Sequence, residues 1–172
     1  VITNERWGAG GVVQTAAGRI YFEMPSNSKR KGPWNGYVCS GTVVNDNTSE
    51  RSTIITAAHC VYDDANKAFA RNVLFIPNQD QTTGSGTDLN CSNDPLGCWA
   101  PSFGVVDSNW ATGTFPNNIE WDYAYYVVED IENSNVLDDI AGSLVVSFSI
   151  PSFDDGVDNA SSDDFYFNDQ SQ

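Results

Sequence analysis

The sequence alternates between short apolar runs and polar segments rich in Gly, Asn, Asp and Pro. The runs are built largely from β-branched and aromatic residues, which favour β-strands. We expect strands over residues 19–23, 37–44, 52–56, 73–76, 103–106, 121–128 and 143–150. The polar loop 45–50 connects the second run to the third, so these two strands are expected to form a hairpin. Several short strands with few helices predict an all-β barrel or sandwich.

Two segments depart from this strand pattern. Residues 63–70 predict about two turns of helix, and residues 77–100 form a long connection rich in Gly, Asn, Asp and Thr. Structureless connections of this length are uncommon unless they are functional or tied down. Cys91 and Cys98 lie near the end of this connection and would restrain it if they were bonded to each other.

The stretch 52–60 is the most informative part of the chain. It begins as a β-branched run and ends in Ala57-Ala58-His59-Cys60, and His59 is the only histidine in the sequence. A histidine at the end of a strand is placed where catalytic groups tend to be held. A catalytic imidazole needs an orienting partner on one ring nitrogen, commonly a carboxylate.

Asp122 is the better of two candidates for that partner. It is expected inside an apolar strand, where an unpaired carboxylate is costly to bury. Asp107 follows its strand and begins the polar sequence Asp-Ser-Asn, so we expect it to be a turn or cap residue. The alternative reading of the pair is a histidine satisfied by backbone groups and an aspartate at the end of a strand.

Composition excludes several classes of function. The formal charge is −15; residues 1–71 contain six acidic and eight basic residues, and residues 72–172 contain seventeen acidic and no basic ones. Nucleic-acid binding is not expected, because phosphate binding needs clustered cations. No apolar run approaches the ~18 residues of a membrane-spanning helix. The acidic segments 154–158 and 163–164 are candidates for Ca²⁺, although they lack the spacing of a calcium loop; no other cofactor is expected.

The four cysteines, at positions 39, 60, 91 and 98, point to disulfides rather than to a metal site. There is neither a Cys-x-x-Cys pair nor a second histidine, which argues against zinc. Four cysteines allow three connectivities. The simplest pairs nearest neighbours, Cys39 with Cys60 and Cys91 with Cys98. Disulfides imply an oxidising compartment, so we expect a secreted or periplasmic protein.

Three motifs resemble those of trypsin-like serine proteases, of the bacterial secreted type. Thr56-Ala57-Ala58-His59-Cys60 is similar to the family's histidine motif. The segment 39–44 resembles the strand that supplies the partner cysteine, and the segment 122–128 resembles the strand that begins with the catalytic aspartate. The resemblance implies the first six-stranded antiparallel β-barrel of a double-barrel fold, plus the segment crossing to the second barrel. It also implies that His59 is the general base and that Asp122 orients it.

The serine motif of that family does not occur in the sequence. Gly84-Ser85-Gly86 precedes Asp122 and lacks the flanking pattern, and Ser143 opens an expected strand. We expect residues 1–140 to form the barrel that contains His59 and Asp122. Residues 141–172 would form the connection between barrels and the start of the second. The nucleophile is expected on a missing or separate C-terminal part, so this chain is predicted to be inactive alone.

The expected function is therefore serine endopeptidase activity on a polypeptide substrate. The competing hypothesis is a secreted, non-enzymatic β-barrel binding module, or a pseudoprotease without a nucleophile. The N-terminal residues Val1-Ile2-Thr3-Asn4 resemble the apolar N-termini that activation cleavage creates in the family, so Val1 is a candidate activation N-terminus.

Overall fold

The computed structural model describes residues 10–79, 91–129 and 136–146. These residues are mostly β-structure with a few short helices, which confirms the expected all-β class. The strands are β1 (Ala17–Pro25), β2 (Trp34–Val44), β3 (Arg51–Thr56), β4 (Tyr62–Asp63), β5 (Ala68–Phe69), β6 (Arg71–Pro77), β7 (Phe103–Val106) and β8 (Ala124–Glu129). The helices are α1 (Gly11–Ala16), α2 (Ser108–Thr112) and α3 (Leu137–Ala141), with 3₁₀ turns η1 (Ala58–Cys60), η3 (Cys91–Asn93) and η4 (Ile119–Trp121).

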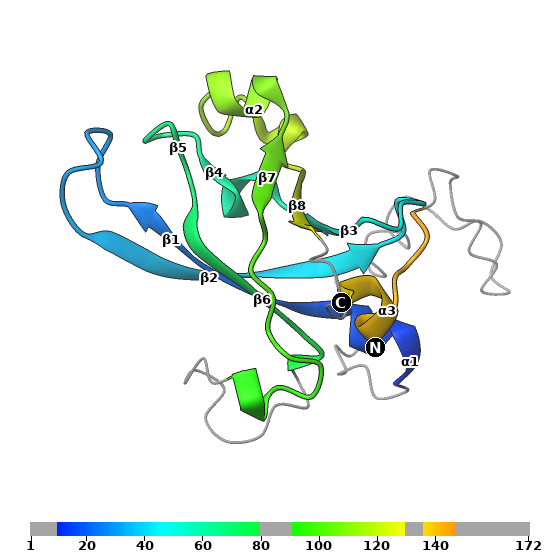
Figure 1. The fold of residues 1–172 in the computed structure, drawn as a ribbon. Coiled ribbons are helices and arrows are strands. Elements are labelled where there is room, and N and C mark those ends of the chain that lie inside the picture. The colour runs from blue at the N-terminus through cyan, green and yellow to red at the C-terminus, as the bar shows by residue number, and fades with distance from the viewer. Residues whose placement is uncertain (1–9, 80–90, 130–135, 147–172) are drawn as a thin grey trace, which may run out of the picture.

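Six strands form one antiparallel sheet in the order β6-β1-β2-β3-β8-β7. The sheet curls into a half-barrel, with β1 and β2 as its long central pair (Figure 1). The segment before β7 bridges the edge strand β6 at one point, where Phe75 of β6 and Trp99 exchange two backbone hydrogen bonds of 2.8 Å. The predicted hairpin is present, because β2 pairs with β3 from Thr42 opposite Ile55 to Val44 opposite Thr53.

The core fills the concave side of this curled sheet. On β1 the side chains of Ile20, Phe22 and Met24 are buried and alternate with more exposed residues, as expected for a strand with one face on the core. Val43, Ile54, Phe75 and Tyr126 bring residues of β2, β3, β6 and β8 into the same cluster. Trp110 of α2 and Leu137 of α3 complete the cluster from two sides.

The predicted helix over residues 63–70 is wrong, and the segment is the small hairpin β4–β5. The carboxylate of Asp63 accepts hydrogen bonds from the backbone N–H groups of Ala65 and Asn66 and from the Asn66 side chain. This side-chain-to-backbone pattern favours a turn over a helix. Lys67 adopts a positive φ of 53°, which also ends any helical path.

Two other predicted strands are wrong in part. The strand expected over 121–128 begins at Ala124, because the turn η4 occupies its start. Asp122 therefore lies in a turn rather than inside a strand. Residues 143–146 form only an isolated parallel bridge between Leu144 and Val44, and residues 147–150 lie outside the described residues. None of the described helices is long and apolar enough to cross a membrane.

Both nearest-neighbour disulfides are present, and all four cysteines are paired. Cys91–Cys98 closes a short loop around η3, with its Cα atoms 5.2 Å apart. As expected, this bond restrains the end of the long connection that leads to β7. The loop is further held where the indole N–H of Trp99 donates to the Leu96 carbonyl at 3.0 Å.

Candidate active site

His59 is presented to solvent by the single 3₁₀ turn η1, which follows β3. The turn is closed by hydrogen bonds from Cys60 N–H to the Ala57 carbonyl and from Val61 N–H to the Ala58 carbonyl. Ala58 and Cys60 on either side are buried. The imidazole between them remains exposed, with 58% of its side-chain surface accessible. Small and sulfur-containing neighbours therefore anchor the turn while the histidine alone points outward.

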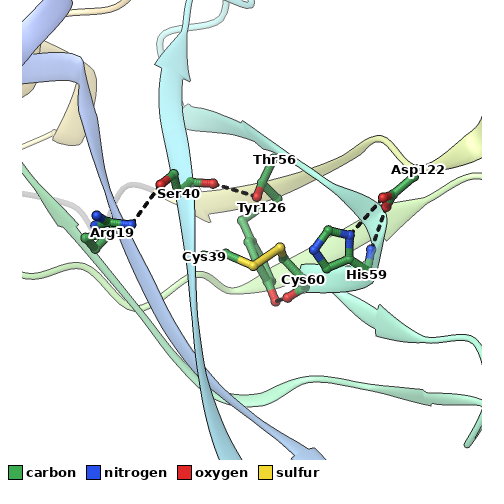
Figure 2. The surroundings of a disulfide bond; sticks show 8 residues. All are labelled: Arg19, Cys39, Ser40, Thr56, His59, Cys60, Asp122 and Tyr126. Atoms are coloured by element: carbon green, nitrogen blue, oxygen red, sulfur yellow. Dashed lines mark hydrogen bonds and ion pairs between the residues drawn. A yellow bond between two sulfur atoms is a disulfide. The ribbon is translucent and has the colours of Figure 1, made fainter. Parts of the chain in front are cut away.

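Asp122 contacts this turn at two atoms. Its Oδ1 accepts the backbone N–H of His59 at 2.8 Å, and its Oδ2 lies 2.8 Å from Nδ1 of the His59 ring. The aspartate follows η4, and its own N–H donates to the Ile119 carbonyl at 3.1 Å. The carboxylate is 24% accessible, so it is partly shielded from water. The predicted pairing of His59 with Asp122 is thus present as a hydrogen-bonded contact (Figure 2).

The contact determines which ring nitrogen of His59 holds the proton. An ionised carboxylate only accepts hydrogen bonds, so Nδ1 must be the donor when the imidazole is neutral. Nε2 is then left with its lone pair free to accept a proton. Within the described part of the chain, Nε2 has no hydrogen-bond partner. A ring with one nitrogen oriented by a carboxylate and the other open to solvent is equipped for general-base chemistry.

A disulfide joins the His59 turn to the neighbouring strand. Cys60 of η1 is bonded to Cys39 of β2, with Cα atoms 6.2 Å apart. Beside it, the Thr56 hydroxyl donates to the Ser40 carbonyl at 2.8 Å, which ties the end of β3 to β2. Figure 2 shows the disulfide next to the imidazole and these contacts around it. The chain is therefore attached to β2 on both sides of His59, at Thr56 before it and at Cys60 after it.

A second set of contacts holds the loop that leads to Asp122 against the β4–β5 hairpin that follows His59. The Lys67 ammonium donates to the carbonyls of Ala111 and Gly113 at 3.0 and 2.6 Å. Asp64 accepts from the Phe115 N–H at 2.7 Å and from the Asn118 side chain at 3.1 Å. The hairpin after the histidine and the loop before the aspartate are thus fastened to each other.

Sequence reasoning did not identify Asp64 or Lys67, because their partners lie more than forty residues away in sequence and are mostly backbone groups. It placed Asp107 correctly as a cap. Asp107 is the N-cap of α2 and accepts the N–H of Asn109 at 2.7 Å. It also accepts a hydrogen bond from the Tyr123 hydroxyl at 3.2 Å, and it does not contact His59.

Of the remaining candidate residues, only Ser143 lies within the described ranges. Val1, Gly84-Ser85-Gly86 and the acidic segments considered for Ca²⁺ lie outside the described residues. Ser143 follows α3 rather than opening a strand. No seryl hydroxyl in the described ranges is hydrogen-bonded to His59.

One group of potential metal ligands lies at the site, but two of its three members are bonded to each other. The ligand atoms of Cys39, His59 and Cys60 lie within 4.8 Å of one another. Because the two sulfurs are bonded to each other, they are not available as thiolates, which is the form that binds metals. This cluster is therefore a disulfide next to a histidine rather than a metal centre.

Comparison with known proteins supports a protease-related, chymotrypsin-like fold. The family model of the lysyl endopeptidase C-terminal domain matches residues 21–97, a range that includes His59 and both cysteines of its disulfide but ends before Asp122. The crystal structure of the protease Anisep from Arthrobacter nicotinovorans matches with a TM-score of 0.58 and 26% identity. The match covers 80% of this chain and 51% of that protein, so the chain spans about half of its length. A comparison with curated proteins gave no match.

Proposed function

We propose that this chain supplies the general base and the orienting aspartate of a serine endopeptidase. The observation that supports the proposal most strongly is the double contact of Asp122 with the backbone N–H and the Nδ1 of His59. This contact fixes the tautomer that leaves Nε2 free to accept a proton. The similarity to a lysyl endopeptidase domain and to a bacterial protease supports a proteolytic function in general.

In the proposed mechanism, His59 Nε2 removes the proton from a serine hydroxyl as its oxygen attacks the scissile carbonyl. The imidazolium that forms is stabilised by the negative charge of Asp122. His59 then donates the proton to the leaving amine, and the same pair activates the water that hydrolyses the acyl-enzyme. Each step uses the one exposed nitrogen of the ring, while the other nitrogen keeps its contact with the carboxylate.

The proposal requires a serine, which we assign to a C-terminal chain or segment outside the described residues. In this proposal residues 1–140 form the barrel that contains His59 and Asp122. Residues 141–172 then lead toward the second barrel. Residues 1–172 alone are expected to be inactive, since loss of the nucleophile lowers turnover on the order of a million-fold in serine proteases. The two disulfides support a secreted or periplasmic location.

Cleavage after lysine is the specificity we propose for the complete enzyme. The family model is that of a lysyl endopeptidase domain. The sequence contains only three lysines, at positions 29, 31 and 67. The ammonium of Lys67 is bound to two backbone carbonyls and is thereby withheld from an active site. A chain with few accessible lysines would resist self-cleavage by an enzyme that cuts after lysine.

The test is hydrolysis of matched peptides by the serine-bearing protein. The peptides differ only in having Lys, Arg or Glu before the scissile bond. We expect cleavage after Lys, and loss of cleavage in His59→Ala. Cleavage after Glu would overturn the proposed specificity, whereas hydrolysis that persists in His59→Ala would overturn the proposed mechanism. Absence of hydrolysis of any peptide would favour the binding module or pseudoprotease.

A further inference from the structure

Tyr126 of β8 reaches the turn that presents His59. Its side chain is buried, with 3% of the residue exposed. Its hydroxyl donates a hydrogen bond of 2.8 Å to the carbonyl oxygen of Cys60, 66 residues earlier in the chain. Figure 2 shows Tyr126 beside the Cys39–Cys60 disulfide, and Cys60 is the neighbour of His59 in η1. A buried carbonyl that lost this donor would be left unsatisfied, so the contact is costly to break.

Tyr126 and Asp122 lie four residues apart on one segment and contact neighbouring residues of η1. Asp122 accepts the N–H of His59, and Tyr126 donates to the C=O of Cys60. The backbone between these two groups is the part of the chain that bears the imidazole. One segment therefore fixes this part of the turn at both ends, and it also supplies the carboxylate that faces Nδ1.

The neighbouring strand leaves room for this arrangement. Gly104 of β7 lies opposite Tyr126 in the sheet. A Cβ at position 104 would lie 2.5 Å from Cγ1 of Val61 and 3.1 Å from Cε1 of Tyr126. A glycine here lets the tyrosine ring and Val61 lie close together beneath the turn. Burial raises the pKa of the Tyr126 hydroxyl, so the hydroxyl keeps its proton and remains a donor.

We propose that Tyr126 is a positioning residue for the His59–Asp122 pair: its hydroxyl holds the Cys60 carbonyl and thereby keeps the imidazole aligned with the carboxylate. The claim that this alignment serves catalysis rests on the proposed function. The claim that Tyr126 maintains the alignment, which is the geometric part of the proposal, does not, because alignment of the pair is measurable in the chain without any substrate. Tyr126 itself contacts neither the imidazole nor the carboxylate.

Nuclear magnetic resonance of the single histidine tests the geometric part directly. In a ¹⁵N-labelled sample of the chain, His59 gives the only imidazole signals, so its Nδ1–H is assigned without ambiguity. We expect Tyr126→Phe to exchange this proton with water roughly five to ten times faster, the effect of losing one hydrogen bond from the turn. Tyr125→Phe is the matched control, because it removes a hydroxyl one residue away that has no hydrogen bond among the described residues. We expect it to leave the exchange rate unchanged.

Two results would overturn the proposal: an unchanged exchange rate in folded Tyr126→Phe, or an equal acceleration in both variants, which would indicate general loosening. Where Tyr126→Phe does not fold, 3-fluorotyrosine at position 126 replaces it. This residue keeps the donor and strengthens it, so exchange should slow; an unchanged rate would contradict the proposal. In the active protein, Tyr126→Phe should lower kcat with little change in KM. A change in Nδ1–H exchange without any peptidase activity would leave the positioning role intact and refute only the proposed function.

Discussion

The carboxylate of Asp122 holds both the backbone N–H and the Nδ1 of His59, each at 2.8 Å. The two contacts come from different oxygens of one carboxylate, so the ring cannot rotate away from the aspartate without losing its alignment with the turn. An exposed histidine would otherwise sample several rotamers. The arrangement thus keeps a solvent-accessible imidazole in one orientation and one tautomer.

Asp122→Asn should therefore impair activity far more than it impairs folding. The amide preserves the shape of the side chain, but it removes the negative charge and permits the wrong histidine tautomer. We expect kcat of the serine-bearing protein to fall about 10⁴-fold. Asp107→Asn is the matched control, since asparagine is as good an N-cap as aspartate and Asp107 does not touch His59. A comparable loss in both variants would contradict the assignment of Asp122.

The two disulfides should differ in their effect on activity. Replacing Cys39 and Cys60 together by alanine should lower the free energy of unfolding by about 3 kcal/mol and should also reduce kcat, because that bond anchors the His59 turn. Replacing Cys91 and Cys98 should cost somewhat less stability and should leave kcat unchanged. Urea unfolding and peptide hydrolysis of the two double variants provide the measurement. Equal effects on kcat would indicate that the first bond has no special role at the site.

Lys67 should contribute to stability through the two hydrogen bonds that its ammonium donates to backbone carbonyls. Its two carbonyl partners lie at the end of α2, which begins the path to Asp122: Ala111 is in the helix and Gly113 follows it. Lys67→Met leaves these carbonyls without their donor, and we expect a loss of about 1–3 kcal/mol in the free energy of unfolding. Lys29→Met is the control, since Lys29 lies in an exposed turn. Its effect should stay within about 0.5 kcal/mol. A negligible effect of Lys67→Met in urea unfolding would show that the contacts are unimportant.

Asp46, in the turn between β2 and β3, should make the protein less stable in acid. Desolvation raises the pKa of Asp46, but hydrogen bonds from Arg51, Thr53 and the Thr48 N–H together outweigh it and hold the pKa below the usual 3.8. The unfolded chain therefore binds this proton first. The stabilisation is fully present above the unfolded pKa and is lost as the pH falls through the folded one.

In Asp46→Asn the difference in the free energy of unfolding between pH 6 and pH 2 should shrink by about 1 kcal/mol, the size typical of one intramolecular hydrogen bond. Thermal unfolding across this pH range measures the difference. The same dependence on pH in the variant and the parent chain would contradict the role assigned to Asp46.

Much of the sheet could be predicted from local sequence pattern. The runs that became β2, β3, β6 and β7 were recognisable because β-branched and aromatic residues favour strands. The β4–β5 hairpin was predicted as a helix. Its turn depends on side-chain hydrogen bonds of Asp63, which compete with helix formation in a way that apolar spacing does not reveal.

The contact between His59 and Asp122 was predicted from the sequence, but partly for the wrong reason. Asp122 was expected to need a partner because it would be buried in a strand, yet it lies partly exposed in a turn. The family motif, rather than burial, identified it. Tyr126 could not be recognised from sequence, since it looked like any core residue of a strand. Its hydroxyl donates a hydrogen bond to the Cys60 carbonyl, which lies 66 residues earlier and comes near it only in the folded chain.

Labelling with a fluorophosphonate probe decides whether His59 is the general base, because the probe reacts rapidly with a serine only when a general base activates that serine. We expect the serine-bearing protein to be labelled and residues 1–172 alone to remain unlabelled. We also expect His59→Ala to slow labelling about 10³-fold or more, in line with the loss of general-base catalysis. Labelling of the His59→Ala protein at the rate of the parent protein would contradict the role of His59 as the general base.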